Sequence, residues 1–383
     1  MMIRTRRAVM CGAALLASAM AVTLAAVPAQ ADGPGWRVVE ADPKPDWDDL
    51  VTVATSSRHN AWVFGGVIGE TPPMRPIARR WVDGAWHDVA LPDEVVGYID
   101  AASTTSARNV WAIADHGDAG PSYALRWDGR AWTSSHRWEE GLTSDVITTG
   151  PRDAWVFGYS RAGDGVGTWH FDGSRWSRAE VGDLLLERGS AVSARDIWAV
   201  GATRLTGCGD RTVAHFDGRQ WRAVPVGDAL PPDIPQPDEG GPHQCVHLRD
   251  VLATSPRDVW VTGNVYRSDG ADQYEERPVL AHWDGRMWRS QNIPGVWIPS
   301  RLASDGRGGL WITGWDDSSG PTPEATPLMH RAADGTWRTA TIDASGRTAR
   351  IRDLALIPGT RSLWGVGRIE TPEEIDGAIY RYR

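Results

Sequence analysis

The 383-residue chain predicts an all-β fold, a seven-bladed β-propeller with four-stranded blades, on three observations. A tryptophan on a short strand that ends in glycine returns about every 50 residues, a spacing typical of propellers. An Asp-Gly turn follows an apolar strand in most copies, and the two ends of the chain look like complementary parts of one blade. The repeated tryptophans are Trp62, Trp111, Trp155, Trp198, Trp260, Trp311 and Trp364.

The copy around Trp260 shows how each blade is expected to be built. Residues 250–254 form the innermost strand, and a tight turn containing proline and aspartate leads to a second strand at 259–263. A longer, variable loop precedes the third strand at 279–283. The Asp-Gly pair that follows is the strongest short hairpin signal, so Trp288 is expected to open the fourth strand.

The seventh copy stops after its third strand, and the start of the chain supplies what it lacks. Residues 379–383 form a strand with no turn after it, whereas residues 32–36 begin with an Asp-Gly turn. We therefore expect the N-terminal strand to complete the last blade and close the ring, which removes open strand edges. The alternative, an open solenoid of sheets, would leave both terminal half-blades unpaired.

Residues 1–31 are typical of a signal peptide. Three arginines precede an apolar stretch at residues 8–27, and Ala29-Gln30-Ala31 is a small-x-small cleavage site. Similarity to a twin-arginine signal is loose, so Sec export is favoured; a retained anchor is the rival interpretation. We expect a secreted, extracellular protein with a single propeller domain at residues 32–383 and no membrane attachment after cleavage.

Cys208 and Cys245 are the cysteines that remain after the predicted cleavage. An even pair in an oxidising compartment predicts a disulfide. The two cysteines fall in the longest insertions, residues 202–212 and 226–247, and the second insertion contains five prolines and is not expected to continue a sheet. The bridge would tie together two loops of the same face.

The charge and the motifs restrict the partners. The formal net charge is −9 and Lys44 is the single lysine, which argues against nucleic acid or an anionic membrane as partner. The sequence has no G-x-S-x-G, H-E-x-x-H or Walker motif. We expect no cofactor and no metal, and a monomer that binds a glycan or an extracellular protein.

Residues that recur once per blade are interpreted as structural. Most of the 22 tryptophans occupy such columns and are expected to fill the wedges between sheets. A basic column precedes the aromatic of each third strand, and its histidines lie on separate blades, too far apart to share a metal ion. This column consists of Arg80, Arg126, His170, His215, His282, Arg331 and Arg381.

The long connections, from second to third strand and from fourth to first, emerge on one face because successive strands alternate in direction. We expect this face to carry the function. Aromatic rings beside carboxylates suit sugars or cationic ligands; the alternative is an acidic rim whose tryptophans fold inward and plug the channel. The candidate ligand-binding residues are Trp138, Trp297, Trp315, Glu275, Asp316 and Asp317.

A second candidate is a polar ring at the start of the inner strands. Asp145, Arg188 and Asp250 share one position in the repeat, and Arg301 and Asp353 are close to equivalent. Alternating charge on adjacent blades indicates ion pairs around the channel mouth. Mutual charge satisfaction is the favoured interpretation, and a polar ligand pocket on the axis is the alternative.

The W-x-x-G and W-D-G-x-x-W hallmarks resemble those of bacterial secreted seven-bladed propellers, a broad and functionally mixed family. The resemblance implies the fold and export, and no particular reaction. The first functional hypothesis is an exported binding protein. A carbohydrate-active enzyme, either a glycosidase with two carboxylates or a polysaccharide lyase, is the alternative, and a structural or assembly role is a third.

Overall fold

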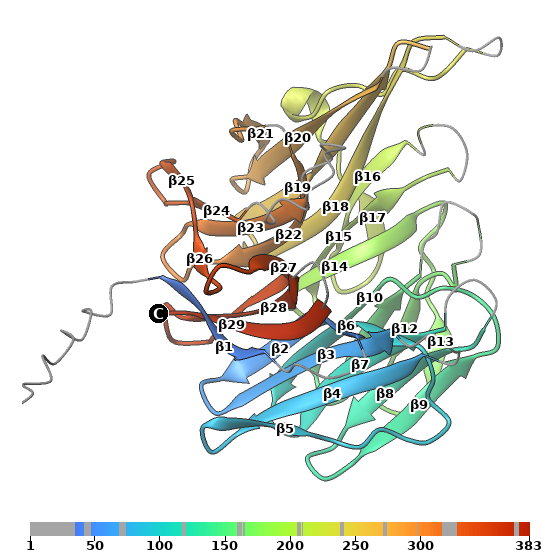
Figure 1. The fold of residues 1–383 in the computed structure, drawn as a ribbon. Coiled ribbons are helices and arrows are strands. Elements are labelled where there is room, and N and C mark those ends of the chain that lie inside the picture. Colours follow the sequence, from blue (N-terminus) through green and yellow to red (C-terminus); the bar gives the residue numbers. More distant parts are fainter. Residues whose placement is uncertain are drawn as a thin grey trace, which may run out of the picture. The chain divides into compact units, whose positions relative to one another are not determined.

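The computed structural model is an all-β ring of seven blades that follow one another along the chain (Figure 1), which confirms the predicted fold. The propeller forms the compact unit Pro34–Arg383. The predicted signal peptide lies outside the described residues. The structure describes residues 35–41, 47–68, 74–116, 120–158, 163, 165–204, 208, 210–237, 241–270, 274–295, 297–315, 328–370 and 375–383.

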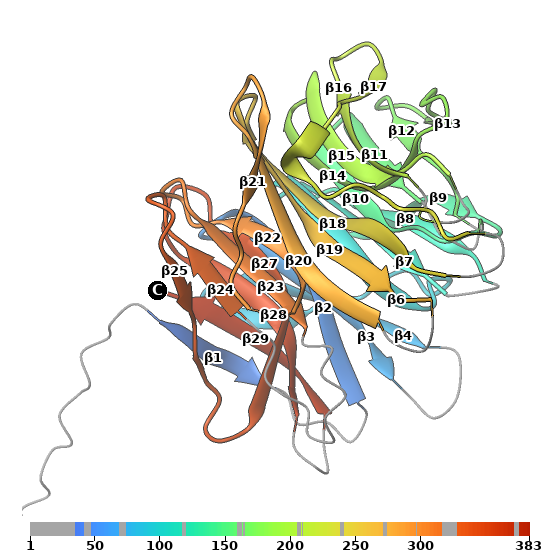
Figure 2. The same cartoon turned by 90° about the horizontal axis from the view of Figure 1, so that it is seen from above.

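Blades 1 to 6 are antiparallel sheets whose strands run in chain order from the axis outward, and Figure 2 shows the same blades from above. Blade 1 contains β2 (Trp47–Ser57), β3 (Asn60–Ile68), β4 (Arg75–Val82) and β5 (Ala85–Asp88). Blade 2 contains β6 (Tyr98–Ser106), β7 (Asn109–Asp115), β8 (Ser122–Trp127) and β9 (Trp132–Trp138). Blade 3 contains β10 (Asp145–Gly150), β11 (Asp153–Phe157), β12 (Trp169–Phe171) and β13 (Trp176–Arg178).

Blade 4 contains β14 (Leu185–Ser193), β15 (Asp196–Ala202), β16 (Arg211–Phe216) and β17 (Trp221–Ala223), followed by a 3-10 turn, η1 (Gly227–Ala229). Blade 5 contains β18 (His243–Ser255), β19 (Asp258–Ser268), β20 (Tyr274–Trp283) and β21 (Trp288–Gln291). Blade 6 contains β22 (Ile298–Ser304), β23 (Leu310–Trp315), β24 (Leu328–Arg331) and β25 (Trp337–Thr339). The long strands β18, β19 and β20 project past the neighbouring blades at the top of Figure 1, and we call this projection the blade-5 arm.

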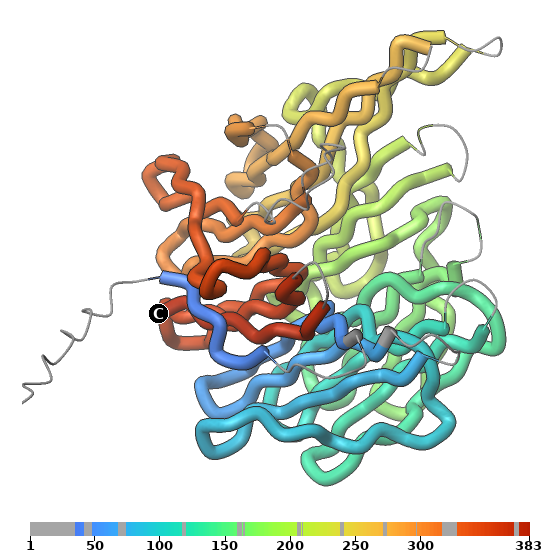
Figure 3. Tube along the Cα trace, in the orientation of Figure 1, coloured from blue at the N-terminus to red at the C-terminus, as the bar shows by residue number. Residues whose placement is uncertain are grey.

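Blade 7 is closed by the N-terminal strand, as predicted. It contains β27 (Thr348–Leu356), β28 (Leu363–Glu370) and β29 (Ile375–Tyr382), with β1 (Trp36–Ala41) antiparallel to β29 so that Trp36 faces Tyr382. Figure 3 shows this blue segment beside the red C-terminal strand. A short fifth strand, β26 (Ile342–Asp343), pairs with β1 in parallel and was not anticipated from the sequence.

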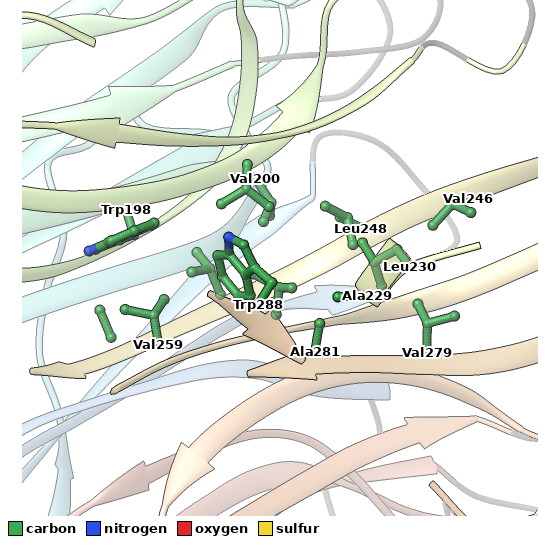
Figure 4. Packing of buried hydrophobic residues seen from close by; sticks show 14 of the residues in the cluster. Trp198, Val200, Ala229, Leu230, Val246, Leu248, Val259, Val279, Ala281 and Trp288 are labelled. Carbon is green, nitrogen blue, oxygen red and sulfur yellow. The ribbon is translucent and has the colours of Figure 1, made fainter. Parts of the chain in front are cut away.

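The repeated tryptophans pack between blades. Trp62 of blade 1 makes edge contacts with Trp127 and Trp132 of blade 2, with ring centroids 4.9 and 5.1 Å apart. Figure 4 shows the corresponding contact of Trp198 in blade 4 with Trp288 in blade 5. Trp364 of blade 7 contacts blade 1 in the same way, so the aromatic contacts continue across the point where the ring closes.

The basic column lies against these tryptophans and is structural. The His282 ring stacks on Trp260 at 4.1 Å and hydrogen-bonds to Asp258 at 2.7 Å, and the Arg381 guanidinium lies 4.3 Å from the ring centre of Trp364. The assignment of Arg331 to this column is wrong, because His330 faces Trp311. The sixth hairpin is one residue longer than that of blade 5, so Arg331 occupies the aromatic position instead.

Candidate ligand-binding site

The inner strands share a β-bulge close to the face that carries the long connections. In six blades the pairing of inner and second strands shifts by one residue at the same point, for instance between Leu50 and Thr52 in blade 1 and between Leu248 and Asp250 in blade 5. In blade 3, β10 begins at this level with Asp145. Because bulges redirect side chains and are common beside binding sites, this level of the propeller is where a site is expected.

The glycine of the W-x-x-G hallmark is explained by the bulge. A Cβ atom added to Gly65 or Gly263 would collide with the carbonyl oxygen of Asp49 or His247, which the bulge pushes against the second strand. Gly201, Gly314 and Gly367 face the same obstacle. The repeated glycine therefore makes room for the backbone distortion that shapes the channel mouth.

The bulge arranges two successive rings of residues around the channel. The first ring, at the bulge, consists of Val51, Asp100, Ser144, Glu187, Arg249, Ser300 and Arg352. The second ring, one residue further along each strand, consists of Thr52, Ala101, Asp145, Arg188, Asp250, Arg301 and Asp353. The five residues of the sequence-derived polar ring thus lie at one register position on consecutive blades.

The aspartates of the second ring accept hydrogen bonds from backbone N–H groups of the next blade. Asp145 accepts a 2.9 Å hydrogen bond from the N–H of Gly189 in the next blade, and Asp250 accepts one of 2.7 Å from Leu302. Burial raises the pKa of both carboxyl groups, that of Asp250 to about 6. These carboxylates tie one inner strand to the next, which is a structural role.

The two arginines of the second ring are placed differently. Nη1 of Arg188 lies 3.8 Å from the Asp145 carboxylate, and although burial lowers its pKa, Asp145 and Asp250 hold that pKa above its usual value. Arg301 hydrogen-bonds through Nη1 to the Ser300 carbonyl at 3.0 Å, and burial together with repulsion by Arg188 lowers its pKa. Both side chains line the axial channel, a cavity of 430 Å³, and also the pocket above it.

That upper cavity, which we call the mouth pocket, has a volume of 550 Å³ and is lined mainly by basic and polar groups. Asp100 is the one carboxylate among the described residues that line it. The other lining residues are Val51, Thr143, Ser144, Arg188, Ser300, Arg301, Gly314, Trp315, Arg350, Ile351, Arg352 and Arg368.

Two buried carboxylates hold the blade-7 arginines of the mouth pocket. Asp49 accepts hydrogen bonds from Nε and Nη2 of Arg352, and Glu370 binds Nε of Arg350 at 2.8 Å and Nε of Arg368 at 2.5 Å. Burial raises the pKa of Asp49 despite these arginines. The guanidinium groups are therefore fixed in position before any ligand arrives, which lowers the entropic cost of binding.

Two further titratable groups lie at the mouth. Burial and the Asp115 carboxylate raise the pKa of Asp100 to about 6. Burial and the Asp49 carboxylate raise the pKa of Tyr98 to about 12. Asp100 is therefore a carboxyl group that changes charge near neutral pH, whereas Tyr98 stays protonated.

The six candidate ligand-binding residues are not brought together. The expectation that Trp138 and Trp297 present exposed rings is wrong: they are 7% and 5% exposed, because Trp138 packs on Trp169 and Trp297 packs in the apolar cluster of blades 5 and 6. Trp315 does line the mouth pocket, with the Arg249 guanidinium 4.7 Å from its ring centre. Asp316 and Asp317 lie outside the described residues.

Glu275 lies apart from the mouth pocket, on the blade-5 arm. It is exposed, pairs with Arg277 at 2.6 Å, and lines a second cavity of 470 Å³ with Tyr274 and His243. The predicted disulfide between Cys208 and Cys245 is present, and Cys245 pairs with Tyr266 near the outer end of this arm. Cys245 lies in β18, which begins at His243, so the last part of the 226–247 insertion continues the sheet, contrary to expectation.

In the described part of the chain, no helix is long and apolar enough to cross a membrane. Among the same residues, no group of three or more His, Cys, Asp or Glu side chains is arranged to hold a metal ion.

The chain resembles known proteins in fold. No protein-family model matches it, and no curated protein matches it in sequence. One similar solved structure is YCF48 bound to a D1 peptide, with a TM-score of 0.54 and 14% identity; the match covers 92% of this chain and 97% of that one. Another is YCF48 from Cyanidioschyzon merolae, with a TM-score of 0.50 and 10% identity; the match covers 91% of this chain and 98% of that one. A GH74 xyloglucanase from Xanthomonas campestris is also similar, with a TM-score of 0.50 and 17% identity. The match covers 87% of this chain and about half, 53%, of that enzyme. At these identities the similarity shows the fold alone.

Proposed function

We propose that this chain is an exported binding protein that takes its ligand in the mouth pocket. The observation that carries the proposal is the lining of that pocket, where five arginines from three blades surround a 550 Å³ cavity on the ring axis. Concave sites with a few convergent polar groups are the usual ligand sites of proteins. The disulfide fits export, because such bonds persist in oxidising compartments.

The fold alone does not choose between ligands. Proteins of this fold include one bound to a peptide and one named as a xyloglucanase, so both a protein and a glycan ligand are compatible with a propeller. The choice has to come from the chemistry of the pocket. Fixed guanidinium groups, one carboxyl group and one indole ring are groups that bind polar ligands without needing to react with them.

A carbohydrate-active enzyme is the second candidate, and Asp100 favours it. A carboxyl group whose pKa is raised to about 6 is suited to protonating a leaving group. A glycosidase also needs a second carboxylate across the substrate, and the described lining offers Asp100 alone. A lyase needs a base, and Tyr98, whose pKa is raised to about 12, is not among the described residues that line the pocket. Binding without turnover is therefore the preferred function.

Binding to a glycan array, followed by titration calorimetry of the hits, tests the proposal. We expect Trp315→Ala and Arg352→Ala to abolish binding, since both residues line the mouth pocket. The matched control is Arg277→Ala on the blade-5 arm, where the arginine is exposed and pairs with Glu275; it should bind like the wild type. Loss of binding in the control alone would contradict the proposal.

Asp100→Asn distinguishes binding from catalysis. A binding protein shows no turnover of its ligand before or after this substitution, whereas an enzyme loses turnover and still binds. An assembly protein would instead migrate in a complex with another exported protein, and Trp315→Ala and Arg352→Ala would leave that complex intact.

A further inference from the structure

We infer that the ligand of the mouth pocket is a carboxylated sugar, a uronic acid residue of an acidic glycan, whose carboxylate is bound by Arg301 together with Arg188. The inference rests on the proposed function and names the ligand class of the same site. It runs against the acidic net charge of the whole chain, −9, because the lining of the pocket differs from the average surface.

Arg301 is the first reason to expect an anion. A guanidinium group has five N–H donors, and within the described residues the hydrogen bond of Arg301 is the single one to the Ser300 carbonyl. On the second ring Arg301 lies between Asp250 and Asp353, whose carboxylates accept hydrogen bonds from backbone N–H groups. No carboxylate oxygen of the described residues forms an ion pair with Arg301. Arg301 is half-buried and lines the mouth pocket, so its remaining N–H donors are available to a carboxylate bound there.

The second reason is the neighbourhood of Arg301. Arg188 lies on the same ring two blades away, and repulsion between the two guanidinium groups adds to burial in lowering the pKa of Arg301. Both line the floor of the mouth pocket and the channel below. An anion placed between two arginines converts this repulsion into two charge-assisted hydrogen-bonding contacts, which are the strong ones.

The blade-7 arginines extend the basic surface up the wall. Arg350, Arg352 and Arg368 each use part of their donor set on Asp49 or Glu370, so their positions are fixed while other N–H groups remain for a ligand. The pocket therefore presents several prepositioned donors, which suits a ligand that offers many acceptor oxygens.

The remaining lining favours a sugar over an acidic peptide. Asp100 supplies an acceptor for hydroxyl groups, and Trp315 supplies a ring against which a sugar can pack. The described aliphatic lining is limited to Val51 and Ile351, which leaves little surface for the apolar side chains of a peptide. A uronic acid combines one carboxylate with several hydroxyl groups on a compact ring and uses all of these groups at once.

Titration calorimetry of the full exported protein with short oligogalacturonates and oligoglucuronates tests the inference. We expect binding to these probes and at least tenfold weaker binding to the same oligosaccharides after their carboxyl groups have been reduced to alcohols. Arg301→Lys keeps the positive charge but loses the planar guanidinium group, whose paired N–H donors match the two oxygens of a carboxylate, and should weaken binding by tenfold or more. Arg352→Ala serves as a second variant, because its side chain is 43% exposed and its loss is tolerated more easily than that of a buried group.

The outcomes separate the two claims. Equal binding of the acidic and the reduced oligosaccharides would overturn the uronate inference and leave the mouth pocket as a glycan site. If the protein bound an acidic peptide and none of the sugars, and Arg301→Lys weakened that binding in the same way, the sugar ligand would be wrong and the mouth pocket would remain the binding site. Binding of uronates that is unchanged in both arginine variants but lost in Arg277→Ala would overturn both the inference and the proposed function.

Discussion

The Asp353 carboxylate in the last blade accepts a 3.0 Å hydrogen bond from the backbone N–H of Val53 in the first blade. Asp145 and Asp250 make the equivalent bond to the next inner strand from blades 3 and 5. The aspartates of the channel ring thus join neighbouring blades, and one of these bonds spans the point where the ring closes. The arginines between them, Arg188 and Arg301, are the residues left to face the mouth pocket.

The pH dependence of stability should reveal the buried aspartates. Burial raises the pKa of Asp250 to about 6 from its usual 3.8, so the folded state holds a proton that the unfolded state releases. Its contribution to the free energy of unfolding is therefore greatest below pH 3.8 and falls as the pH rises through about 6, by up to about 3 kcal/mol. Urea unfolding of Asp250→Asn, which keeps an acceptor for Leu302, should show a smaller fall with pH than the wild type. An unchanged slope would exclude Asp250 as its source.

Gly263→Ala should be strongly destabilising. The added methyl group meets the carbonyl oxygen of His247 at the bulge, and relieving that overlap requires the strand to shift, at a cost of about 3 kcal/mol. Gly150→Ala is the matched control, since nothing lies within 4 Å of a Cβ atom there, and its effect should stay within about 1 kcal/mol. Thermal unfolding of both variants measures the difference. Equal melting temperatures would show that the bulge does not explain the hallmark glycine.

Trp36→Ala tests closure of the ring by the N-terminal strand. Trp36 is buried, makes an edge contact of 5.4 Å with Trp311 of blade 6, and faces Tyr382 across the sheet. Removing a buried tryptophan costs about 3–5 kcal/mol. The control is Val39→Ala on the same strand, where the side chain is 43% exposed. Comparable urea midpoints for the two variants would mean that β1 contributes little to the closed ring.

Binding of a uronate should strengthen as the pH falls from about 8 to about 5. Asp100, which faces Asp115, Arg188, Arg301 and Arg352, loses its negative charge near pH 6, whereas a sugar carboxylate with an ordinary pKa of about 3.5 stays ionised. Asp250 on the ring below titrates in the same range and adds to the effect. Asp100→Asn should bind more tightly than the wild type at pH 8 and depend less on pH in calorimetric titrations. Weaker binding at low pH would contradict the arginine-based site.

The sequence carries the architecture because the residues that pack between blades recur at a fixed spacing. The tryptophan column, the Asp-Gly hairpins and the complementary ends are enough to predict seven blades and the closure by β1. Predictions from the repeat fail where a blade departs from it. The sixth hairpin is one residue longer, so Arg331 lies outside the basic column. The strand β26 has only two residues, too few to show a strand pattern in the sequence.

The candidate site was harder to predict, for a physical reason. Trp138 and Trp297 fall outside the repeat columns, and nothing in their sequence neighbourhood shows that Trp169 or the cluster of blades 5 and 6 covers them. The ring position of Arg188 and Arg301 was visible from the repeat. The additional arginines at 350, 352 and 368 join the pocket only because the bulge and the closed ring place residues of blade 7 around the same cavity as residues of blades 4 and 6.

Hydrogen exchange with and without a saturating uronate oligosaccharide tests the central claim most directly, because it locates the ligand. We predict slower amide exchange at the start of the inner strands, in residues 187–189, 300–302 and 350–353. These segments contain the pocket-lining residues Arg188, Ser300, Arg301, Arg350, Ile351 and Arg352. Residues 264–268 of the blade-5 arm should exchange at an unchanged rate. Slower exchange confined to that arm, or no change anywhere in the ring, would contradict a ligand site at the arginine-lined mouth.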